Sequence, residues 1–431
     1  MTIGIKASRP TCRFCDAPLT ETFVDLGSMP LANSYLQPGD LARHEPAYPL
    51  HARVCDTCRL VQVDDVVPPE AIFGDYAYFS SYSASWVAHA GRYAVMARQR
   101  FGLTGASQVV EIASNDGYLL KHFRDAGIPV LGIEPAGNVA AAAEAAGIPT
   151  RVTFFGEATA RSLVAEGIAA DLLVGNNVLA HVPDLNDFVA GLAIVLKPDG
   201  VLTMEFPHLL RLIEDVQFDT IYHEHFSYFS LLTVEQVFAR HGLRVFDVES
   251  IPTHGGSLRI FVCHDACRSL ASGPALALLR AEEKQAGLDR DTGYRGFAAR
   301  VAQVRDGLLA FLAAQRAAGC RIAAYGAAAK GNTLLNYCGI GPDAIAYVVD
   351  VSPHKQGRLL PGSHIPIESP DILRRHRPDF LLILPWNLKR EIIEAHGYIA
   401  EWGGQFVVAI PQIEIIPAGD AARRDALRAA G

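Results

Sequence analysis

Two pairs of cysteines near the amino terminus have the residue type and spacing of a metal site. Cys12 and Cys15 form one CxxC pair, and Cys55 and Cys58 form a second. Four thiolates from two such pairs enclose Zn²⁺ in a tetrahedron and leave no position for a substrate. We therefore expect a structural zinc site, with unrelated buried or redox-active cysteines as the alternative. The other cysteines lack this pairing and are expected to be small buried hydrophobic residues: Cys263, Cys267, Cys320 and Cys338.

The segment 109–117, with the sequence VVEIASNDG, has the pattern of a cofactor turn between a buried strand and a helix. In an α/β sheet a nucleoside can lie across such a turn. One strand later Glu134 stands at a strand end, where a carboxylate can accept hydrogen bonds from both ribose hydroxyls. The turn lacks the GxGxxG pattern of a dinucleotide site, because Ala113 and Asn115 replace the glycines. An ordinary α/β turn with a chance glutamate is the alternative.

Ionisable groups gather among aromatic residues in the run 218–230, FDTIYHEHFSYFS. They form either a surface loop or a dry site in which pKa values suit proton transfer. If this segment is extended, His223 and His225 point to opposite sides, so at most one of them faces a given pocket. A catalytic loop and satisfied structural histidines both remain open. His181 follows a predicted strand and is expected on the same rim of the sheet as the cofactor turn.

Two further segments have unusual compositions. The run 75–83, DYAYFSSYS, contains Tyr76 and Tyr82 and lacks core periodicity, so it is either a lid over the cofactor or a linker. The turn 326–331, GAAAKG, precedes Asp350 at a predicted strand end and resembles a nucleotide crevice without the P-loop pattern. A phosphate partner for Lys330 is a hypothesis, and a solvated lysine at a helix start is its alternative.

The hydrophobic pattern predicts a scaffold of alternating strands and helices around these residues. A first parallel sheet is expected from strands at 108–112, 130–133, 172–174 and 201–206. Residues 270–318 are expected to be helical and to connect two domains. Their apolar stripe is formed by Val301, Val304, Leu308, Phe311 and Leu312. A second α/β unit is expected from strands at 321–325, 345–349, 380–384 and 406–409.

Size and charge exclude several classes of protein. A chain of 431 residues is too long for one hydrophobic core and predicts about three domains. The net charge of −8 offers no attraction to nucleic acid, and no Lys/Arg cluster compensates for it. No apolar run approaches the roughly 18 residues that span a bilayer, and the first residues lack the apolar region of an export signal. We expect a cytoplasmic protein with a small-molecule acceptor and no nucleic-acid or membrane partner.

The motifs occur together in a characteristic order. The two CxxC pairs are followed by the E-x-(G/A)-x-N-D-G turn, the rim segment ending in His181, a D-x-x-x-x-E-H-F run, and a G-A-x-A-K turn with D-x-(S/T)-P-x-K-Q. From Cys12 to Ile415 this order resembles the sugar C-methyltransferase family, whose members include 3-C-methyltransferases acting on dTDP-4-keto-deoxysugars. The joint occurrence of five ordered motifs is more specific than any one of them.

The resemblance implies an α/β fold with an N-terminal four-cysteine zinc module, a central class I methyltransferase Rossmann-like domain and a C-terminal second Rossmann-like α/β domain. The expected units are a zinc-binding module at 1–70, an S-adenosylmethionine-binding domain at 71–269, a helical connector at 270–318, a substrate-binding domain at 319–417 and a tail at 418–431. Zinc is expected at Cys12, Cys15, Cys55 and Cys58. S-adenosylmethionine is expected at Glu111, Ala113, Asn115, Asp116, Gly117, Glu134, Pro135, Asn176 and Asn177.

The resemblance also implies an active site and a substrate. The catalytic residues are expected to be Tyr76, His181, Tyr222, Glu224 and His225. His225 is the favoured base with Glu224 orienting it, while His181 or Tyr222 stabilises an enolate. A nucleotide-sugar is expected between the middle and C-terminal domains, at Tyr82, His223, Lys330, Asp350 and Arg358.

The prediction is a C-methyltransferase of a nucleotide-linked 4-keto-sugar, as a monomer or homodimer. O-methylation, or methylation of another keto acceptor, is the nearest alternative. An NAD-dependent sugar oxidoreductase built on the C-terminal unit and a non-catalytic binding protein are the alternatives from other classes.

Overall fold

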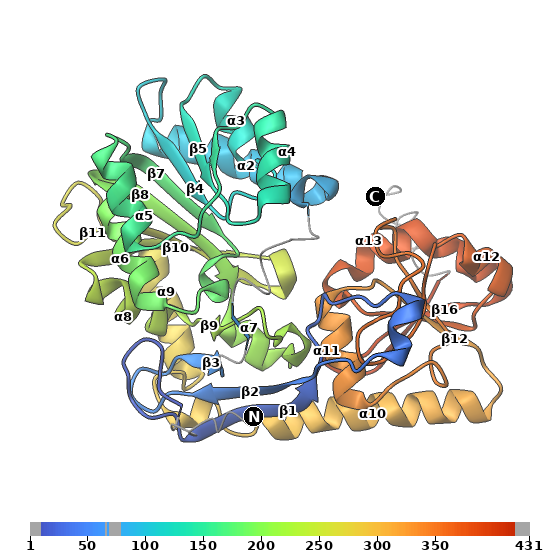
Figure 1. Cartoon of the computed structure of the whole chain (residues 1–431). Helices are drawn as coiled ribbons and strands as arrows, with labels where there is room; N and C mark the ends of the chain where they lie inside the picture. The colour runs from blue at the N-terminus through green and yellow to red at the C-terminus, as the bar shows by residue number, and fades with distance from the viewer. Residues whose placement is uncertain (1–9, 65–66, 69–78, 419–431) are drawn as a thin grey trace, which may run out of the picture.

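The computed structural model describes residues 10–64, 67–68 and 79–418. Within these ranges the strands form three sheets. Figure 1 shows two α/β units side by side above the smallest sheet. The helices of the described ranges include none long and apolar enough to cross a membrane.

The smallest sheet joins the amino-terminal module to a distant part of the chain. Its strands, in order, are β1 (Glu21–Met29), β2 (Tyr48–Val54), β3 (Val61–Val63) and β9 (Ser227–Tyr228). Val61 pairs with Tyr228 in the antiparallel contact of β3 with β9. The histidine-rich run that ends in β9 is therefore attached to the module, which the sequence pattern did not predict.

The central sheet carries the cofactor turn. Its order is β10-β11-β8-β7-β4-β5-β6. Five of its strands are parallel, namely β4 (Val109–Ile112), β5 (Val130–Ile133), β6 (Thr150–Arg151), β7 (Ala170–Asn176) and β8 (Leu196–Pro207). The predicted parallel sheet is thus confirmed, but β10 (Leu243–Ile251) and β11 (Ser257–His264) add an antiparallel edge that was not predicted.

Helices cover both faces of the central sheet, so its inner strands are buried on both sides, as in other α/β proteins. They are α2 (Ala84–Phe101), α3 (Leu120–Arg124), α4 (Gly137–Ala145), α5 (Glu157–Ala165), α6 (Leu185–Val195) and α8 (Leu231–Arg240). Helix α7 (Leu209–Glu214) packs instead in the core that includes β1 and the C-terminal sheet. Hydroxyl side chains cap two of them. Ser83 accepts the amide of Trp86 at α2, and Ser230 accepts that of Thr233 at α8.

The C-terminal sheet has a reversal of strand order that creates a crevice. Its order is β14-β13-β12-β15-β16-β17. The strands are β12 (Ile322–Tyr325), β13 (Val348–Val349), β14 (Ile367–Glu368), β15 (Phe380–Ile383), β16 (Gln405–Val408) and the antiparallel β17 (Glu414–Pro417), and the helices are α11 (Ala329–Cys338), α12 (Ile372–His376) and α13 (Lys389–His396). The chain moves from β12 outward to β14 and then returns to β15 on the other side. Ligands of open α/β sheets bind beyond the strand ends at such a switch point.

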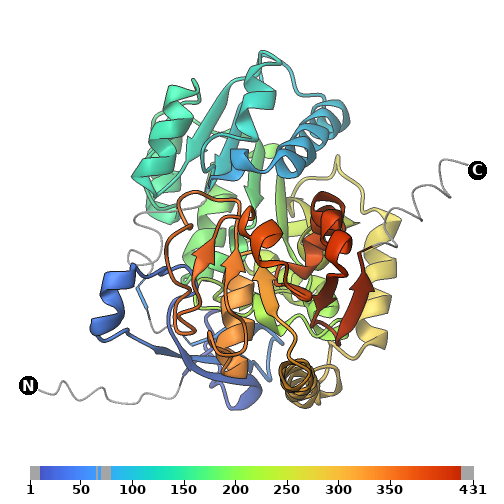
Figure 2. The same ribbon diagram turned by 90° about the vertical axis from the view of Figure 1, so that its right-hand side faces the viewer.

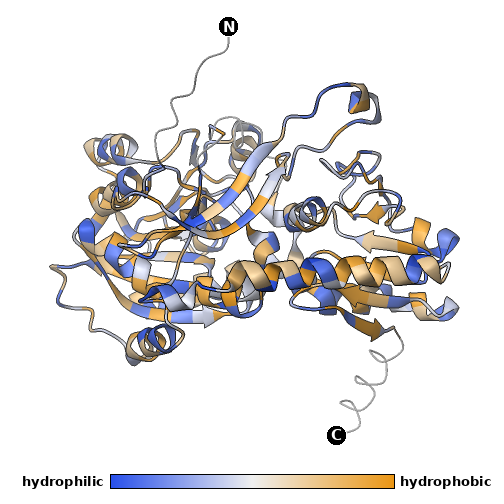
Figure 3. Cartoon of the chain, turned by 90° about the horizontal axis from the view of Figure 1, so that it is seen from below, coloured by the Kyte–Doolittle hydropathy of each residue, from blue (hydrophilic) through white to orange (hydrophobic). Residues whose placement is uncertain are grey.

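The predicted connector consists of α9 (Pro274–Gln285) and the long α10 (Phe297–Ala317). The buried residues of α10 include all five of the predicted stripe, which is confirmed. Figure 3 shows α10 alongside the β1–β2 ribbon, and Figure 2 shows the helix nearly end-on below the C-terminal sheet. Phe23 of β1 stacks on Phe297 of α10 with ring centroids 4.3 Å apart. One hydrophobic core therefore includes β1, α10 and the C-terminal sheet.

The remaining turns of 3-10 helix lie mostly in connections. They are η1 (Pro38–Ala42), η2 (Ser80–Tyr82), η3 (Leu179–His181), η4 (Phe218–Thr220), η5 (Thr253–Gly255), η6 (Asp291–Gly293), η7 (Trp386–Leu388) and η8 (Gly397–Trp402).

A buried carboxylate holds the connector against the central domain. Glu283 of α9 is fully buried, and its Oε1 accepts hydrogen bonds from His208 Nε2 and the Leu231 amide, both at 2.7 Å. Its Oε2 accepts the Leu232 amide at 2.9 Å. These amides belong to the first turn of α8, where a negative charge also complements the helix dipole.

We predict that Glu283→Ala destabilises the protein strongly, because it leaves these three buried donors without a partner. The expected loss is about 3 kcal/mol, which lowers the melting temperature by roughly 5–10 °C in a differential scanning fluorimetry measurement. The adjacent exposed Lys284→Ala is the matched control and should leave the melting temperature unchanged. Equal melting temperatures for the two variants would contradict the prediction.

Candidate active site and zinc module

The structure brings the four predicted zinc ligands together. Their Sγ atoms lie within 4.8 Å of one another, and all but Cys15 are buried. In the part of the chain that the structure describes, this is the one such group of potential metal ligands. The two loops have the same backbone turn, because Asp16 and Arg59, each directly after the second cysteine of its CxxC pair, both have a left-handed conformation. Four thiolates at this separation repel one another unless a cation lies between them, so the donor set fits Zn²⁺.

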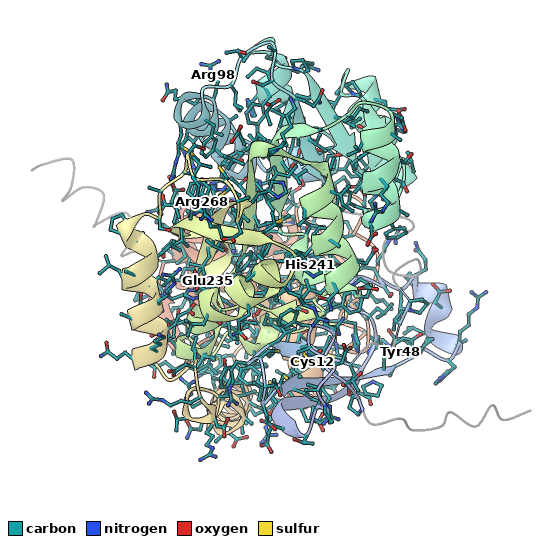
Figure 4. The ribbon with its side chains drawn as sticks, turned by 90° about the vertical axis from the view of Figure 1, so that its left-hand side faces the viewer. Cys12, Tyr48, Arg98, Glu235, His241 and Arg268 are labelled. Atoms are coloured by element: carbon teal, nitrogen blue, oxygen red, sulfur yellow. The ribbon has the colours of Figure 1, made fainter. Side chains whose placement is uncertain are left out.

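The zinc module packs on helix α8 of the central domain, which places it away from the cofactor turn. Arg240 at the end of α8 donates to the Phe14 carbonyl at 2.9 Å, and Thr233 at its start donates to the Cys58 carbonyl at 3.4 Å. Figure 4 shows Cys12 below Glu235 and His241, at this end of the molecule. The site is therefore structural, as expected.

The cofactor turn is shaped by left-handed residues and a carboxylate. Ala113, Asn115 and Gly117 have φ values of 56°, 51° and 76°. A Cβ at Gly117 would approach Ile148 to 2.7 Å, so the close packing also requires glycine. Glu134 accepts the amides of Asn115 and Ala136, each at 2.9 Å, and thereby fixes the turn against the end of β5.

Several buried polar atoms around this turn have no hydrogen-bond partner among the described residues. They are both carboxylate oxygens of Glu111, Oδ1 of Asp116, and the amide oxygens of Asn176 and Asn177. Burial, followed by repulsion from Glu134, raises the pKa of Glu111 well above its usual value. Such unpaired groups are costly and rare in folded proteins. Their acceptor character fits a ligand with an ammonium group and ribose hydroxyls, which S-adenosylmethionine carries.

The segment before α2 closes over the turn. The Ser80 amide donates to Asn115 Oδ1 at 2.9 Å, and the Ser81 amide donates to Asp116 Oδ2 at 3.0 Å. Tyr82 is 71% exposed and stacks on Phe79. Tyr76, an expected catalytic residue, lies outside the described residues.

The histidine-rich run forms a hydrogen-bonded dyad. The Nδ1 of His225 donates to the Thr220 carbonyl at 2.9 Å, so its Nε2 carries the lone pair. That Nε2 lies 2.9 Å from the Tyr222 hydroxyl, which therefore donates to it. Burial, and next the neighbouring His181, holds the pKa of His225 well below its usual value. The imidazole is neutral at pH 7 and available as a base.

His181 completes the group from the end of η3. Its ring meets that of His225 edge to face with centroids 4.6 Å apart, and its Nδ1 donates to the Glu224 carbonyl at 2.7 Å. Burial lowers the pKa of His181 to about 4. Two neutral imidazoles thus lie side by side at the rim of the central sheet.

The structure differs from expectation for Glu224 and His223. The carboxylate of Glu224 contacts Asn33 Nδ2 at 2.6 Å, and burial raises its pKa to about 7. Thr220, not Glu224, orients His225 through the peptide carbonyl. His223 points to the module instead, where its Nε2 donates to the carbonyls of Tyr48 and its neighbour in β2, each at 3.2 Å. The run turns tightly, so alternation of an extended strand does not apply.

Lys330 is partly buried and paired, contrary to the solvated alternative. It is in the first turn of α11, donates to Asn387 Oδ1 at 2.7 Å and lies 4.7 Å from the Trp386 ring centroid. Trp386 in turn donates to Asp219 at 2.8 Å. Burial lowers the pKa of Lys330, while Asp219 opposes this. These groups lie beyond the ends of β12 and β15, on the side of the His225 dyad. The Lys330 ammonium is also among the groups that lower the pKa of His225.

The other expected substrate residues have clear positions. Both oxygens of Asp350 accept backbone amides at 2.8 Å, from Ala327 and Ser352, so this carboxylate shapes the end of β13. Arg358 is partly exposed in the loop that follows.

Sequence reasoning missed Asn33, Trp386, Asn387 and His254, and it noted Asp219 only as the first residue of the D-x-x-x-x-E-H-F run. Asn33 and the two C-terminal residues reach the site by tertiary packing, which no local pattern signals. His254 precedes Gly255 and Gly256, and this pair of glycines was the available signal of a tight turn that holds the histidine.

Fold and site together define a class I S-adenosylmethionine-dependent methyltransferase with a zinc module, and comparison with known proteins agrees. Residues 87–248 match a family described as methyltransferase domain, residues 12–73 a family of zinc binding domains, and residues 252–411 a family described as C-methyltransferase C-terminal domain. The chain is 39% identical over 407 residues to the C-methyltransferase NovU of Streptomyces niveus, covering 94% of this chain and 97% of NovU. The chain belongs to this C-methyltransferase family.

Solved structures resemble less than half of the chain. Magnesium protoporphyrin IX methyltransferase of Synechocystis PCC 6803 with bound S-adenosylhomocysteine has a TM-score of 0.33 and 13% identity, over 41% of this chain and 83% of that chain. The PH0226 protein of Pyrococcus horikoshii OT3 has a TM-score of 0.36 and 16% identity, over 45% and 97%.

We predict that Cys55→Ser abolishes zinc binding and loosens the module, because a hydroxyl is a far weaker ligand than a thiolate. Zinc content measured by mass spectrometry should fall from about one ion per chain to a small fraction, and the melting temperature should drop. Cys320→Ser, at a cysteine outside the cluster, is the control and should retain the metal. Retention of zinc by Cys55→Ser would show that the cluster is not the site.

Proposed function

We propose that this enzyme methylates the carbon next to the ketone of a nucleotide-linked 4-keto-sugar. The observation that carries the proposal is the His225–Tyr222 dyad, a neutral base paired with a hydroxyl donor beside the cofactor site. Methylation of carbon requires removal of a C–H proton, whereas methylation of an alcohol oxygen needs no such step. A ketone next to that carbon makes the proton removable, because the charge passes to the oxygen.

In the proposed reaction, His225 Nε2 takes the proton from the carbon next to the ketone. The C–H electron pair forms the enolate, whose oxygen accepts a hydrogen bond from Tyr222. When the Tyr222 hydroxyl turns from His225 to the substrate oxygen, it also releases the lone pair of Nε2. S-adenosylmethionine supplies an electrophilic methyl group on a positively charged sulfur. The proton on His225 then leaves to solvent.

The nucleotide part is assigned to the C-terminal crevice. Lys330 stands at the start of α11, where its ammonium group and the helix N-terminus both favour an anion. Trp386 and Asn387 from η7 line the same crevice and present a flat apolar face and an amide. A pyrophosphate bound there leaves the sugar directed toward His225, since only a few bonds separate the phosphate-bearing carbon from the ketone. Tyr82 and Arg358 remain candidate contacts at the margins.

We predict that the purified enzyme transfers a methyl group from S-adenosylmethionine to a dTDP-4-keto-deoxysugar, and that it exchanges the proton next to the ketone with D₂O. Mass spectrometry of the sugar nucleotide measures both. His225→Gln should lower both rates at least about 100-fold, because the base is lost. His44→Gln, at an exposed histidine in the module, is the control. Full turnover by His225→Gln would refute the assignment of the base, and methylation without exchange would indicate an oxygen acceptor.

We predict that the acid limb of kcat/KM lies below pH 6.5. Burial and the neighbouring His181 lower the pKa of His225, so the imidazole stays unprotonated as the pH falls through the usual histidine value. Burial raises the pKa of Glu224 to about 7, so this carboxyl can add a second inflection to the pH profile near that value. An inflection near pH 7 that disappears in Glu224→Gln therefore belongs to that carboxyl. An acid limb at or above pH 6.5 that persists in Glu224→Gln would contradict the prediction.

A further inference from the structure

A strained turn between β10 and β11 reaches into the active-site region. His254, in η5, has a φ of 55°, which is unusual for a residue with a side chain. The next residue, Gly255, lies against the C-terminal domain, since a Cβ there would approach Trp386 to 2.3 Å. Backbone strain of this kind persists where the surrounding structure enforces it, and it concentrates at functional sites.

The side chain of His254 lies at the rim of the central sheet that carries the cofactor turn. Its Nε2 is 3.3 Å from Asn177 Nδ2 at the end of β7, and its ring meets the Trp86 ring edge to face at 5.3 Å. The imidazole is exposed to solvent, so a substrate can reach it. His254 is also among the groups that lower the pKa of His225, after burial and His181.

The hydrogen bonds fix which nitrogen carries the proton. The Asn177 amide donates to Nε2 of His254, so the proton is on Nδ1. Among the described residues, no acceptor is bonded to this Nδ1. A neutral imidazole with a directed N–H is a suitable donor to an enolate oxygen, because its acidity is closer to that of the enol than an imidazolium's would be.

A buried ionic network holds the turn in place. Thr253, the residue before His254, donates to Glu205 Oε1 at 3.1 Å. Glu205 is fully buried and also accepts hydrogen bonds from Arg259 at 2.9 Å and His89 at 3.0 Å. The turn therefore has little freedom to move when substrate binds, as preorganised stabilisation of developing charge requires.

We infer that His254 is a further catalytic residue, whose Nδ1–H donates a hydrogen bond to the ketone oxygen as the enolate forms. This inference rests on the proposed function and adds a hydrogen-bond donor from the β10–β11 turn to the Tyr222–His225 dyad. It also explains why the strained histidine occupies a position that favours glycine or asparagine.

The test compares the full-length wild type with His254→Gly, which removes the imidazole without backbone strain, and His254→Asn, which tolerates positive φ and keeps an N–H donor near Nδ1. Arg377→Gly is the matched control, because Arg377 is another left-handed residue but lies at the end of α12. Deuterium exchange of a dTDP-4-keto-deoxysugar without S-adenosylmethionine, methyl transfer, and the affinity for S-adenosylhomocysteine are measured.

We expect His254→Gly to lower exchange and kcat about 100-fold, with S-adenosylhomocysteine affinity within about twofold of wild type. His254→Asn should recover at least about tenfold of that loss, and Arg377→Gly should match wild type. If His254→Gly does not fold, His254→Asp replaces it, since aspartate has the shape of asparagine without the donor.

Exchange at the wild-type rate in His254→Gly would overturn the inference, as would a loss of S-adenosylhomocysteine affinity that accounts for the whole effect. A wild type that neither exchanges nor methylates any 4-keto-sugar nucleotide would instead refute the proposed function.

Discussion

The backbone connection between the amino-terminal sheet and the histidine-rich run is the constraint on which the site depends. Val61 pairs with Tyr228, the Val63 amide donates to the Phe226 carbonyl at 3.1 Å, and the Phe226 amide donates to the Ala180 carbonyl at 2.7 Å. Phe226 is thus bonded on one side to the module and on the other to the rim of the central sheet. His225, the preceding residue, is positioned by two structural units at once, so the zinc module helps to position the proposed base.

The site is accordingly assembled from parts that are distant in sequence. Asn33 of the module holds the Glu224 carboxylate, and Tyr35 donates to the Ala327 carbonyl at the C-terminal crevice at 2.6 Å. The segment around these residues therefore contacts both α/β domains. A rigid frame of this kind suits a reaction in which proton removal and methyl transfer must occur at one carbon in a fixed orientation.

Sequence patterns predicted the parts of this protein that depend on local chemistry. The zinc ligands belong to two short loops, the parallel strands are continuous apolar runs, and the stripe of α10 follows helical periodicity. The unpredicted parts depend on long-range packing. Strand β9 has only two residues, too few for a recognisable pattern. The side chain of His223 points away from the site because the run is not extended. His225 is oriented by the Thr220 carbonyl, a main-chain group that any residue type could provide. A hydrogen bond to a main-chain group cannot be predicted from the types of the residues.

The stacking of Phe23 on Phe297 has a consequence for synthesis of the chain. Strand β1 is made early, but the helix that completes its core emerges from the ribosome only after the whole central domain. The zinc cluster, by contrast, closes with Cys58 and needs only nearby residues. During translation the four metal ligands are therefore together long before α10 is made, and the hydrophobic face of β1 stays without its partner for most of synthesis.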